Sequence, residues 1–398
     1  MKQFESEKDL FSYIRNVVDH NVPSLKDIFK QYNWKTYEAA ETIPLLYDDN
    51  TLLIDSRSEK EFDTSHLPGA VNFPVLSTSE RHFVGLIYKK YSQQAAVWLA
   101  MQYADPKAES LSRFLEENDA GSKSIIIYCW RGGGRSSYLA KMVSDLGFNP
   151  SRISGGFKSY RSLVVDFLEL RDLPFGLIEI SGLTGSGKSE LLKSVKDDFP
   201  VIDLELAARH YSSIFGQVPY DNLNYEPVKN QSSFENNIYG DIIRKINKFP
   251  EYHRDYLIES ESKKVGNFFI PKNIFNEMKN CPSIRVGCSL EERIKRIVKD
   301  YFGTGNKGIT KMMEIMKKNE EFLKSRLSKE IYIEAVTMLQ SGKTSEFTEL
   351  MMVKYYDKTY KDKHKRPIAV INTDSIRDAR LELLEVLKTK NPITGVLD

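Results

Sequence analysis

The sequence predicts an α/β protein of two domains, with helical segments at both ends. Its 398 residues are too many for one typical compact core and suit two or three domains. From Thr51 onward, short apolar runs such as LLID and SIIIYC alternate with turns and with segments of helical periodicity, which is the pattern of a layered α/β domain. A second strand–turn–helix unit begins after Pro174, where FGLIEIS runs into GLTGSGKS.

These patterns divide the chain into four expected segments. Residues 1–45 are expected to form a helical N-terminal segment, and residues 46–172 the first α/β domain. Residues 173–300 are expected to form the second α/β domain, and residues 301–398 a helical C-terminal region rich in Lys and Arg. In the first domain, the helix SSYLAKMVSDLGF is expected to end at Gly147, because glycine is the usual residue after a helix C-terminus.

The composition excludes several classes of protein. The chain is 41% hydrophobic and 28% charged, as ordinary folded soluble proteins are. The charged N-terminus and the lack of any long apolar run predict a cytoplasmic protein without a membrane segment. Three cysteines without a CxxC pair predict neither a disulfide framework nor a zinc site. With 57 basic and 55 acidic residues, any nucleic acid must bind through local patches.

The heptad CWRGGGR at 129–135 is the first candidate site. It lies between an apolar strand and a helix, so its thiol faces the positive end of a helix dipole, and two arginines are close in sequence. These effects favour the thiolate and make Cys129 a candidate nucleophile, although an inert buried cysteine is the alternative. Because successive glycine amides can turn inward, we expect an anion-binding loop made of Trp130, Arg131, Gly132, Gly133, Gly134, Arg135 and Ser136. The C-x5-R length suits a tetrahedral phosphate-bearing substrate.

The stretch LLIDSRSEKEFDTSHLPGAVNFP at 52–74 resembles the first signature of rhodanese domains. The resemblance implies that Asp55 and Arg57 support the thiol loop. It also implies sulfur or selenium chemistry at Cys129, although some relatives with a C-x5-R loop are phosphatases. His66 is expected to hold a turn and not to act as an acid or base.

The octad GLTGSGKS at 182–189 matches the complete P-loop pattern, with an apolar strand before it and a helix after it. Glycine amides and a lysine would bind a diphosphate-like anion, and the Ser189 hydroxyl could hold Mg²⁺. The expected phosphate-binding residues are Gly182, Thr184, Gly185, Ser186, Gly187, Lys188 and Ser189. The later strand YLIESES ends in glutamates where an ordinary NTPase usually has aspartate, so ATP hydrolysis is not expected.

Taken together, these two loops and the sequences around them resemble the tRNA 2-selenouridine synthase family. The resemblance implies a two-step reaction on wobble 2-thiouridine in the anticodon region of tRNA. Geranyl diphosphate first alkylates the sulfur, and selenophosphate then delivers selenium. No tightly bound cofactor is implied, and a selenophosphate-producing enzyme is a further expected partner. Additional second-domain positions carried over from the family are Asp203, His210, Gln231, Glu235, Glu259 and Glu261. Which donor binds at which loop stays open.

Several alternatives remain at this stage. Arg293 and Arg296, on a basic helix, are candidates for contacts with tRNA phosphates, but a solvated helix face would give the same pattern. A phosphatase or sulfurtransferase fused to a P-loop kinase-like domain is the chief rival function, and a scaffold that only senses ligands is a third. The phosphatase is disfavoured because Tyr128, and not histidine, precedes Cys129.

Overall fold

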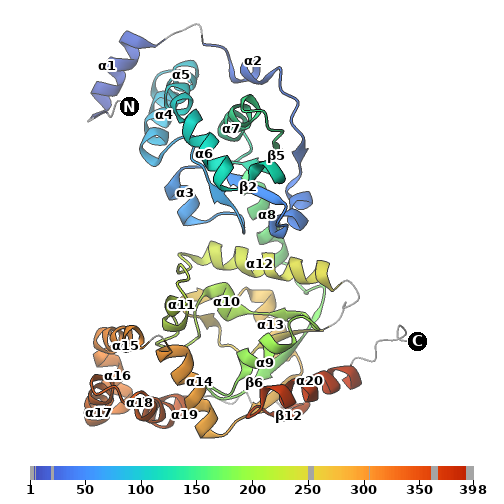
Figure 1. Ribbon diagram of the computed structural model, residues 1–398, viewed down its shortest axis with the longest axis vertical. Helices are drawn as coiled ribbons and strands as arrows, with labels where there is room; N and C mark the ends of the chain where they lie inside the picture. Colours follow the sequence, from blue (N-terminus) through green and yellow to red (C-terminus); the bar gives the residue numbers. More distant parts are fainter. Residues whose placement is uncertain are drawn as a thin grey trace. The chain divides into compact units, whose positions relative to one another are not determined.

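The computed structural model describes residues 4, 6–18, 22–249, 255–303, 305–359 and 366–390 (Figure 1). The chain divides into two compact units, Met1–Phe167 and Leu168–Asp398. Each unit is built around its own five-stranded parallel sheet covered by helices, which confirms the expected α/β class. Among the described residues, no helix is long and apolar enough to cross a membrane.

The first sheet has the strand order β1-β5-β4-β2-β3. The central strands are apolar and β-branched, and in β4 four of five residues are buried, as a parallel sheet covered on both faces requires. Ile54 of β2 pairs with Ile127 of β4, so that both strands end at the same edge of the sheet. The strands are β1 Thr36–Tyr37, β2 Thr51–Asp55, β3 Val71–Asn72, β4 Ser124–Tyr128 and β5 Ser151–Ile153.

Helices and short 3-10 turns cover both faces of this sheet. Helix α4 begins at a capping box between Ser77 and Glu80, and Gly147 follows α7 with a φ of +90°, as expected for its C-terminus. The helices are α1 Glu7–Val17, α2 Leu25–Phe29, α3 Glu59–Thr64, α4 Thr78–Lys90, α5 Gln93–Ala104, α6 Ala108–Glu117, α7 Gly134–Asp145 and α8 Gly156–Leu168, and the 3-10 turns are η1 Ala39–Tyr47, η2 Asp105–Lys107 and η3 Ala120–Ser122.

The N-terminal segment belongs to the first unit and is not a separate structural segment. Strand β1 pairs with β5 through Thr36 and Arg152, and it closes one edge of the sheet. Leu10 and Ile14 of α1 are fully buried in the same core as Ile54. The expected boundary near residue 45 therefore does not separate two structural units. Residues 1–3, 5 and 19–21 of this segment lie outside the described residues.

The second sheet has the order β12-β11-β6-β8-β7, again with all neighbours parallel. Its strands are β6 Gly176–Ser181, β7 Val201–Ile202, β8 Asp255–Glu259, β11 Ser283–Gly287 and β12 Ala369–Asn372, and a small antiparallel hairpin is formed by β9 Lys264–Val265 and β10 Phe268–Phe269. The expected boundary at residue 300 cuts through this unit, because β12 pairs with β11 and Ile371 is buried beside Ile180.

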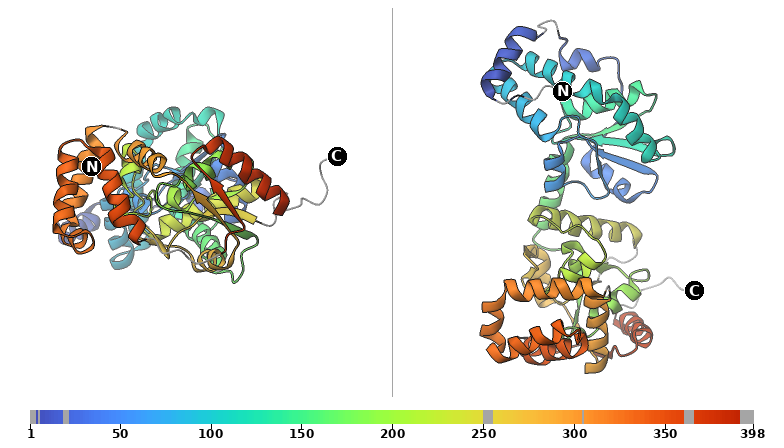
Figure 2. Two further views of the ribbon diagram at one scale, coloured as in Figure 1. Left: turned by 90° about the horizontal axis from the view of Figure 1, so that it is seen from below. Right: turned by 60° about the vertical axis from the view of Figure 1, so that its left-hand side comes forward.

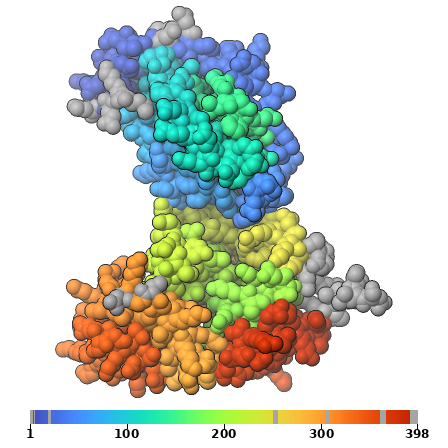
Figure 3. Space-filling model, viewed as in Figure 1, coloured from blue at the N-terminus to red at the C-terminus, as the bar shows by residue number. Residues whose placement is uncertain are grey.

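The helices that follow α14 lie on two sides of the second unit. Those from α15 to α19, orange in the figures, lie together on one side of the unit, whereas α20, red, lies on the other side against α9 (Figures 1, 2 and 3). The chain leaves the sheet after β11, builds the first group and returns through β12. The helices are α9 Lys188–Val195, α10 Leu204–Ala208, α11 Val218–Asn222, α12 Gln231–Lys248, α13 Lys272–Asn280, α14 Leu290–Phe302, α15 Asn306–Lys318, α16 Glu320–Leu327, α17 Lys329–Gln340, α18 Thr344–Met351, the π-helical turn η4 Met352–Tyr356, α19 Asp357–Thr359 and α20 Ile376–Lys390.

Candidate active sites

The thiol loop leaves the carboxyl end of β4 and enters α7. Cys129 follows the last residue of the strand, is 4% exposed, and its Sγ lies 3.3 Å from the Ser136 Oγ. Helix α7 begins at Gly134, so the positive end of its dipole is close to the sulfur, as the sequence predicts. Gly132 has a φ of +66°, and a Cβ there would lie 2.6 Å from the Ile153 carbonyl oxygen, so no other residue fits this turn.

A second glycine holds the loop from the start of α8. A Cβ on Gly156 would lie 2.1 Å from the Cys129 carbonyl oxygen, and the same oxygen accepts a hydrogen bond of 2.9 Å from the Phe157 N–H. The Lys158 N–H donates to the Trp130 carbonyl at 3.0 Å. Sequence reasoning did not single out Gly156. The pair of glycines at the start of a helix was the available signal.

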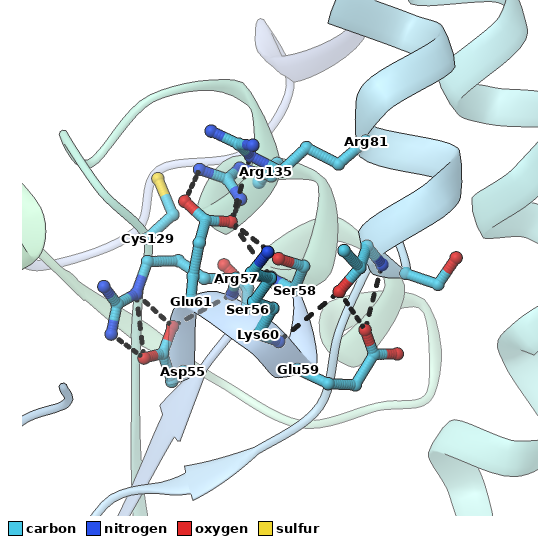
Figure 4. A network of polar contacts seen from close by, with 12 residues as sticks. Asp55, Ser56, Arg57, Ser58, Glu59, Lys60, Glu61, Arg81, Cys129 and Arg135 are labelled. Atoms are coloured by element: carbon cyan, nitrogen blue, oxygen red, sulfur yellow. Dashed lines mark hydrogen bonds and ion pairs between the residues drawn. The ribbon is translucent and has the colours of Figure 1, made fainter. Parts of the chain in front are cut away.

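A buried ion pair lies next to the thiol loop (Figure 4). The Arg57 Nη2 lies 2.6 Å from the Asp55 Oδ2 and also donates to the Ser65 carbonyl at 2.7 Å. Burial acts to lower the Arg57 pKa, but the hydrogen bond and the negative charge of Asp55, with further charges nearby, together outweigh it and the pKa is raised, so the guanidinium stays charged. The Arg57 Cζ lies 4.2 Å from the centroid of the Phe157 ring, and the N–H of Phe157 donates to the Cys129 carbonyl. Asp55 and Arg57 therefore fix the surroundings of the loop and not the sulfur itself.

Glu61 holds the last arginine of the loop (Figure 4). Its carboxylate accepts from Arg135 through Nη1 at 2.5 Å and Nη2 at 3.3 Å, and Arg81 of α4 reaches the same carboxylate at 3.1 Å. Burial acts to raise the pKa of Glu61, but the hydrogen bond from Arg135 and the positive charges of Arg135 and Arg81 together outweigh it, and the pKa is lowered. The Arg135 fork is thus occupied by a protein carboxylate.

A cavity of about 730 Å³ opens over the thiol loop. Its second wall is α4, which ends 39 residues before Cys129 in sequence and was not predicted as part of the site. The cavity combines basic groups with apolar surface, and both Tyr88 and Trp130 are largely exposed, at 55% and 41%. It is lined by Leu76, Arg81, His82, Val84, Gly85, Leu86, Tyr88, Lys89, Cys129, Trp130, Arg131, Gly133, Gly134 and Arg135.

The P-loop joins β6 to α9 in the second unit. Gly185 and Gly187 have φ values of +75° and +81°, a conformation that glycine adopts without strain. Lys188 donates to the Gly182 and Leu183 carbonyls at 3.1 and 3.2 Å, and its Nζ lies 3.6 Å from the Glu259 Oε1. The ammonium group is therefore held at the mouth of the glycine loop, where an anion would bind.

Three carboxylates face this lysine. Glu205, Glu259 and Glu261 are buried and have oxygens within 4.8 Å of one another. Ser189 donates to Glu259 at 2.7 Å and to Glu205 at 3.2 Å. Burial raises the Glu205 pKa well above its usual value, and the neighbouring negative charges of Glu259 and Glu261 raise it further. A divalent cation would relieve this repulsion, so the donor set fits a metal-bound diphosphate.

Glu205 was missed in the sequence. The available signal was Asp-x-Glu directly after the apolar pair of β7. Asp203 itself caps α10 by accepting from the Leu206 N–H at 2.8 Å, and its pKa is raised, chiefly by burial. The P-loop pocket has a volume of about 710 Å³ and is lined by all three glutamates, by Lys188 and Ser189, and by residues of α14.

Comparison with known proteins decides the family. The model of the tRNA 2-selenouridine synthase AAA domain matches residues 176–391. The chain belongs to the tRNA 2-selenouridine synthase family. The model of the rhodanese-like domain matches residues 38–163. The resemblance read from the two loops is thereby confirmed, and the first match extends through β12 and α20, as the second unit does.

Several proteins called tRNA 2-selenouridine synthase are similar to this chain in sequence. A tRNA 2-selenouridine synthase of Nitrosomonas europaea is 32% identical over 267 residues, which are 66% of this chain and 67% of that protein. The protein of this name from Nitrosomonas eutropha is 31% identical over 264 residues, 66% of each chain. That of Bdellovibrio bacteriovorus is 33% identical over 264 residues, 64% of this chain and 66% of the relative. The similarity thus spans about two thirds of the length of these relatives.

Besides Asp203, three positions carried over from the family do not line the P-loop pocket. Gln231 donates to Glu235 at 3.0 Å and exchanges two hydrogen bonds with the backbone of Phe269. Both residues therefore attach α12 to the β9–β10 hairpin. His210 lies against Gly266, where a Cβ would come within 2.8 Å of the imidazole, and burial lowers its pKa. These three side chains shape the hairpin beside the pocket.

Arg293 and Arg296 are held by the protein itself. Arg293 is 5% exposed, donates to the Thr184 carbonyl at 2.9 Å and pairs with Asp357 at 2.6 Å. Arg296 lines the P-loop pocket and pairs with Glu190 at 2.8 Å. The expected contact with tRNA phosphates does not fit Arg293, because its guanidinium is buried in these bonds. Arg293 instead attaches α14 to the P-loop, and Arg296 attaches it to α9.

Proposed function

We propose that this chain converts wobble 2-thiouridine of tRNA into 2-selenouridine in the cytoplasm, using geranyl diphosphate and selenophosphate as donors. The observation that carries the proposal is the presence of two anion sites of different chemistry in one member of this family. One site offers a thiol with arginines, and the other a lysine with carboxylates. A reaction with two phosphate-bearing donors needs two such sites.

The P-loop suits the prenyl transfer. The sulfur of 2-thiouridine would attack the first carbon of the geranyl group, the carbon–oxygen bond would break, and diphosphate would leave. Lys188 is placed to neutralise the charge that develops on that leaving group. Ser189, Glu205 and Glu259 would hold a Mg²⁺ ion, which supplies further charge neutralisation when it is bound.

The thiol loop suits the selenium transfer. The Cys129 thiolate would attack the phosphorus of selenophosphate, so that an S–P bond forms, the P–Se bond breaks and selenide is released, while Arg131 and the loop amides bind the phosphate end. The selenide would add to C2 of the nucleobase and the geranyl thiol would leave. Water would then hydrolyse the S–P bond, which restores Cys129 and releases inorganic phosphate. The apolar surface of the same cavity suits a substrate that carries a prenyl chain.

The geometry argues against the phosphatase alternative. A C-x5-R phosphatase uses the guanidinium of its last loop residue to bind phosphate, whereas here Glu61 occupies the fork of Arg135. Arg81 contacts the same carboxylate, so Arg81, Arg135 and Glu61 form one ion-pair cluster. Phosphatase activity would require this pair to open.

The proposal is tested with the purified chain and tRNA that carries 2-thiouridine. Nucleosides are analysed by mass spectrometry after incubation with geranyl diphosphate alone, with selenophosphate alone, and with both. We expect S-geranyl-2-thiouridine in the first case and 2-selenouridine only when both donors are present. Failure to form either nucleoside, together with hydrolysis of a phosphate ester, would support the phosphatase instead.

A further inference from the structure

An apolar cavity adjoins the P-loop pocket inside the group of helices between β11 and β12. The two spaces share Thr184, Ile297, Tyr301 and Tyr356 as lining residues, so they are neighbours with a common wall. The remaining lining is almost entirely hydrocarbon and thioether, from Phe215, Met312, Phe347, Thr348, Met351 and Met352. A ligand anchored at the P-loop could extend directly into this cavity.

The apolar wall begins at the P-loop itself. A Cβ on Gly185 would lie 3.1 Å from the Ile297 Cγ1 and 3.3 Å from the Met352 Cε. Met352 opens the π-helical turn η4, a local irregularity of the kind often found at functional sites. The anion-binding backbone and the hydrocarbon wall are therefore in van der Waals contact.

Three polar groups of this lining already have partners within the protein. The Tyr301 hydroxyl lies 3.2 Å from the Ser213 Oγ, and the Thr348 hydroxyl donates to the Thr344 carbonyl at 2.8 Å. The Thr184 carbonyl accepts from Arg293. A sugar or purine placed here would lose its hydrogen bonds to water without replacing them, whereas a hydrocarbon chain would not.

The cavity is nearly filled by its own side chains, with about 20 Å³ of open space, enough for about one water molecule. Three of its lining residues are methionines, whose unbranched and flexible side chains can change conformation to admit a chain of variable length. Binding of a hydrocarbon chain would therefore require these side chains to move aside.

We propose that this cavity binds the hydrocarbon chain of a prenyl diphosphate whose diphosphate lies on the P-loop, and that it sets the chain length the enzyme accepts. The inference rests on the proposed function and deepens it, because it assigns the prenyl donor to the second unit. Burial of each CH₂ group contributes about fourfold in affinity, so the five carbons of one isoprene unit change the preference strongly.

The test compares dimethylallyl, geranyl and farnesyl diphosphates as donors, with 2-thiouridine tRNA as acceptor. Met312→Ala and Met351→Ala enlarge the cavity, and each should raise the ratio of kcat/KM for farnesyl over geranyl diphosphate at least about tenfold. Met316→Ala is the matched control. Met316 is buried at 1% in the same helix and core as Met312 but does not line the cavity, so this variant should keep the wild-type ratio.

Binding measurements separate this inference from the proposed function. Titration calorimetry of the full chain with geranyl diphosphate and with inorganic diphosphate reports the contribution of the hydrocarbon chain directly. Preferred binding of geranyl diphosphate that is lost selectively in Met312→Ala or Met351→Ala, without any transfer to tRNA, would keep the cavity and reject the proposed function. Transfer with equal chain-length ratios in all three variants and the wild type would overturn the cavity assignment.

Discussion

Replacing Lys188 by alanine is the sharpest perturbation of the P-loop half of the proposed reaction. The ammonium group is held by two loop carbonyls and the Lys188 side chain is 13% exposed, so little solvent screens it from a bound anion. Loss of one preorganised charge contact in such a site costs roughly 3 kcal/mol of transition-state stabilisation, or about a hundredfold in rate. We therefore expect S-geranyl transfer to slow by about a hundredfold in Lys188→Ala.

The assay is single-turnover formation of S-geranyl-2-thiouridine, with Lys193→Ala as the matched control. Lys193 lines the same pocket from α9 but is exposed, so its removal should change the rate less than about threefold. Equal losses in the two variants would show that only the general charge of the pocket matters. An unchanged rate in Lys188→Ala, with the variant folded, would refute the assignment of the leaving group to the P-loop.

The remaining predictions concern the other groups of the two sites. Cys129→Ala and Cys129→Ser should abolish selenium incorporation and leave S-geranylation largely intact, so that geranylated nucleoside accumulates; loss of both reactions in folded protein would contradict this division. Glu205, whose pKa is raised in the folded chain, makes the native state bind a proton more tightly than the unfolded state does, so stability should fall as pH rises above the usual glutamate range. Melting curves against pH should show this fall, Mg²⁺ should reduce it, and Glu205→Gln should remove it. Arg293→Ala should lower the free energy of unfolding by roughly 2 to 3 kcal/mol, because it leaves Asp357 without its partner. An unchanged free energy of unfolding in a denaturant titration would show that Arg293 does not stabilise the fold. Hydrolysis of ATP should stay at background with and without tRNA, because β8 ends in a glutamate where an ordinary NTPase usually has aspartate. Steady ATP turnover would contradict this expectation.

The local chemistry of both loops was predictable from sequence, because strand, loop and helix are consecutive. Cys129 after β4 and Lys188 at the start of α9 lie as the motifs indicate. Partners far apart in sequence were not predictable in the same way. Arg293 pairs with Asp357 across 64 residues, and a basic helix pattern alone cannot distinguish such a buried partner from solvent.

Short strands and packed termini explain the errors in the boundaries. Strand β12 has only four residues and follows the charged run KDKHKRP, so it carried too little periodic signal to mark a return to the sheet. The two residues of β1 gave still less. The wall that α4 contributes to the thiol cavity depends on tertiary packing, and no local pattern in residues 78–90 announces it.

The bridge from Thr184 through Arg293 to Asp357 has a consequence for turnover. It ties the P-loop backbone to the end of the helical group that surrounds the apolar cavity, so ordering one part reduces the entropy lost in ordering the other. A donor that occupies both places gains from this coupling, whereas released diphosphate occupies only the loop. The released diphosphate should therefore dissociate faster than the prenyl diphosphate, so that the site becomes free for the next donor after each transfer.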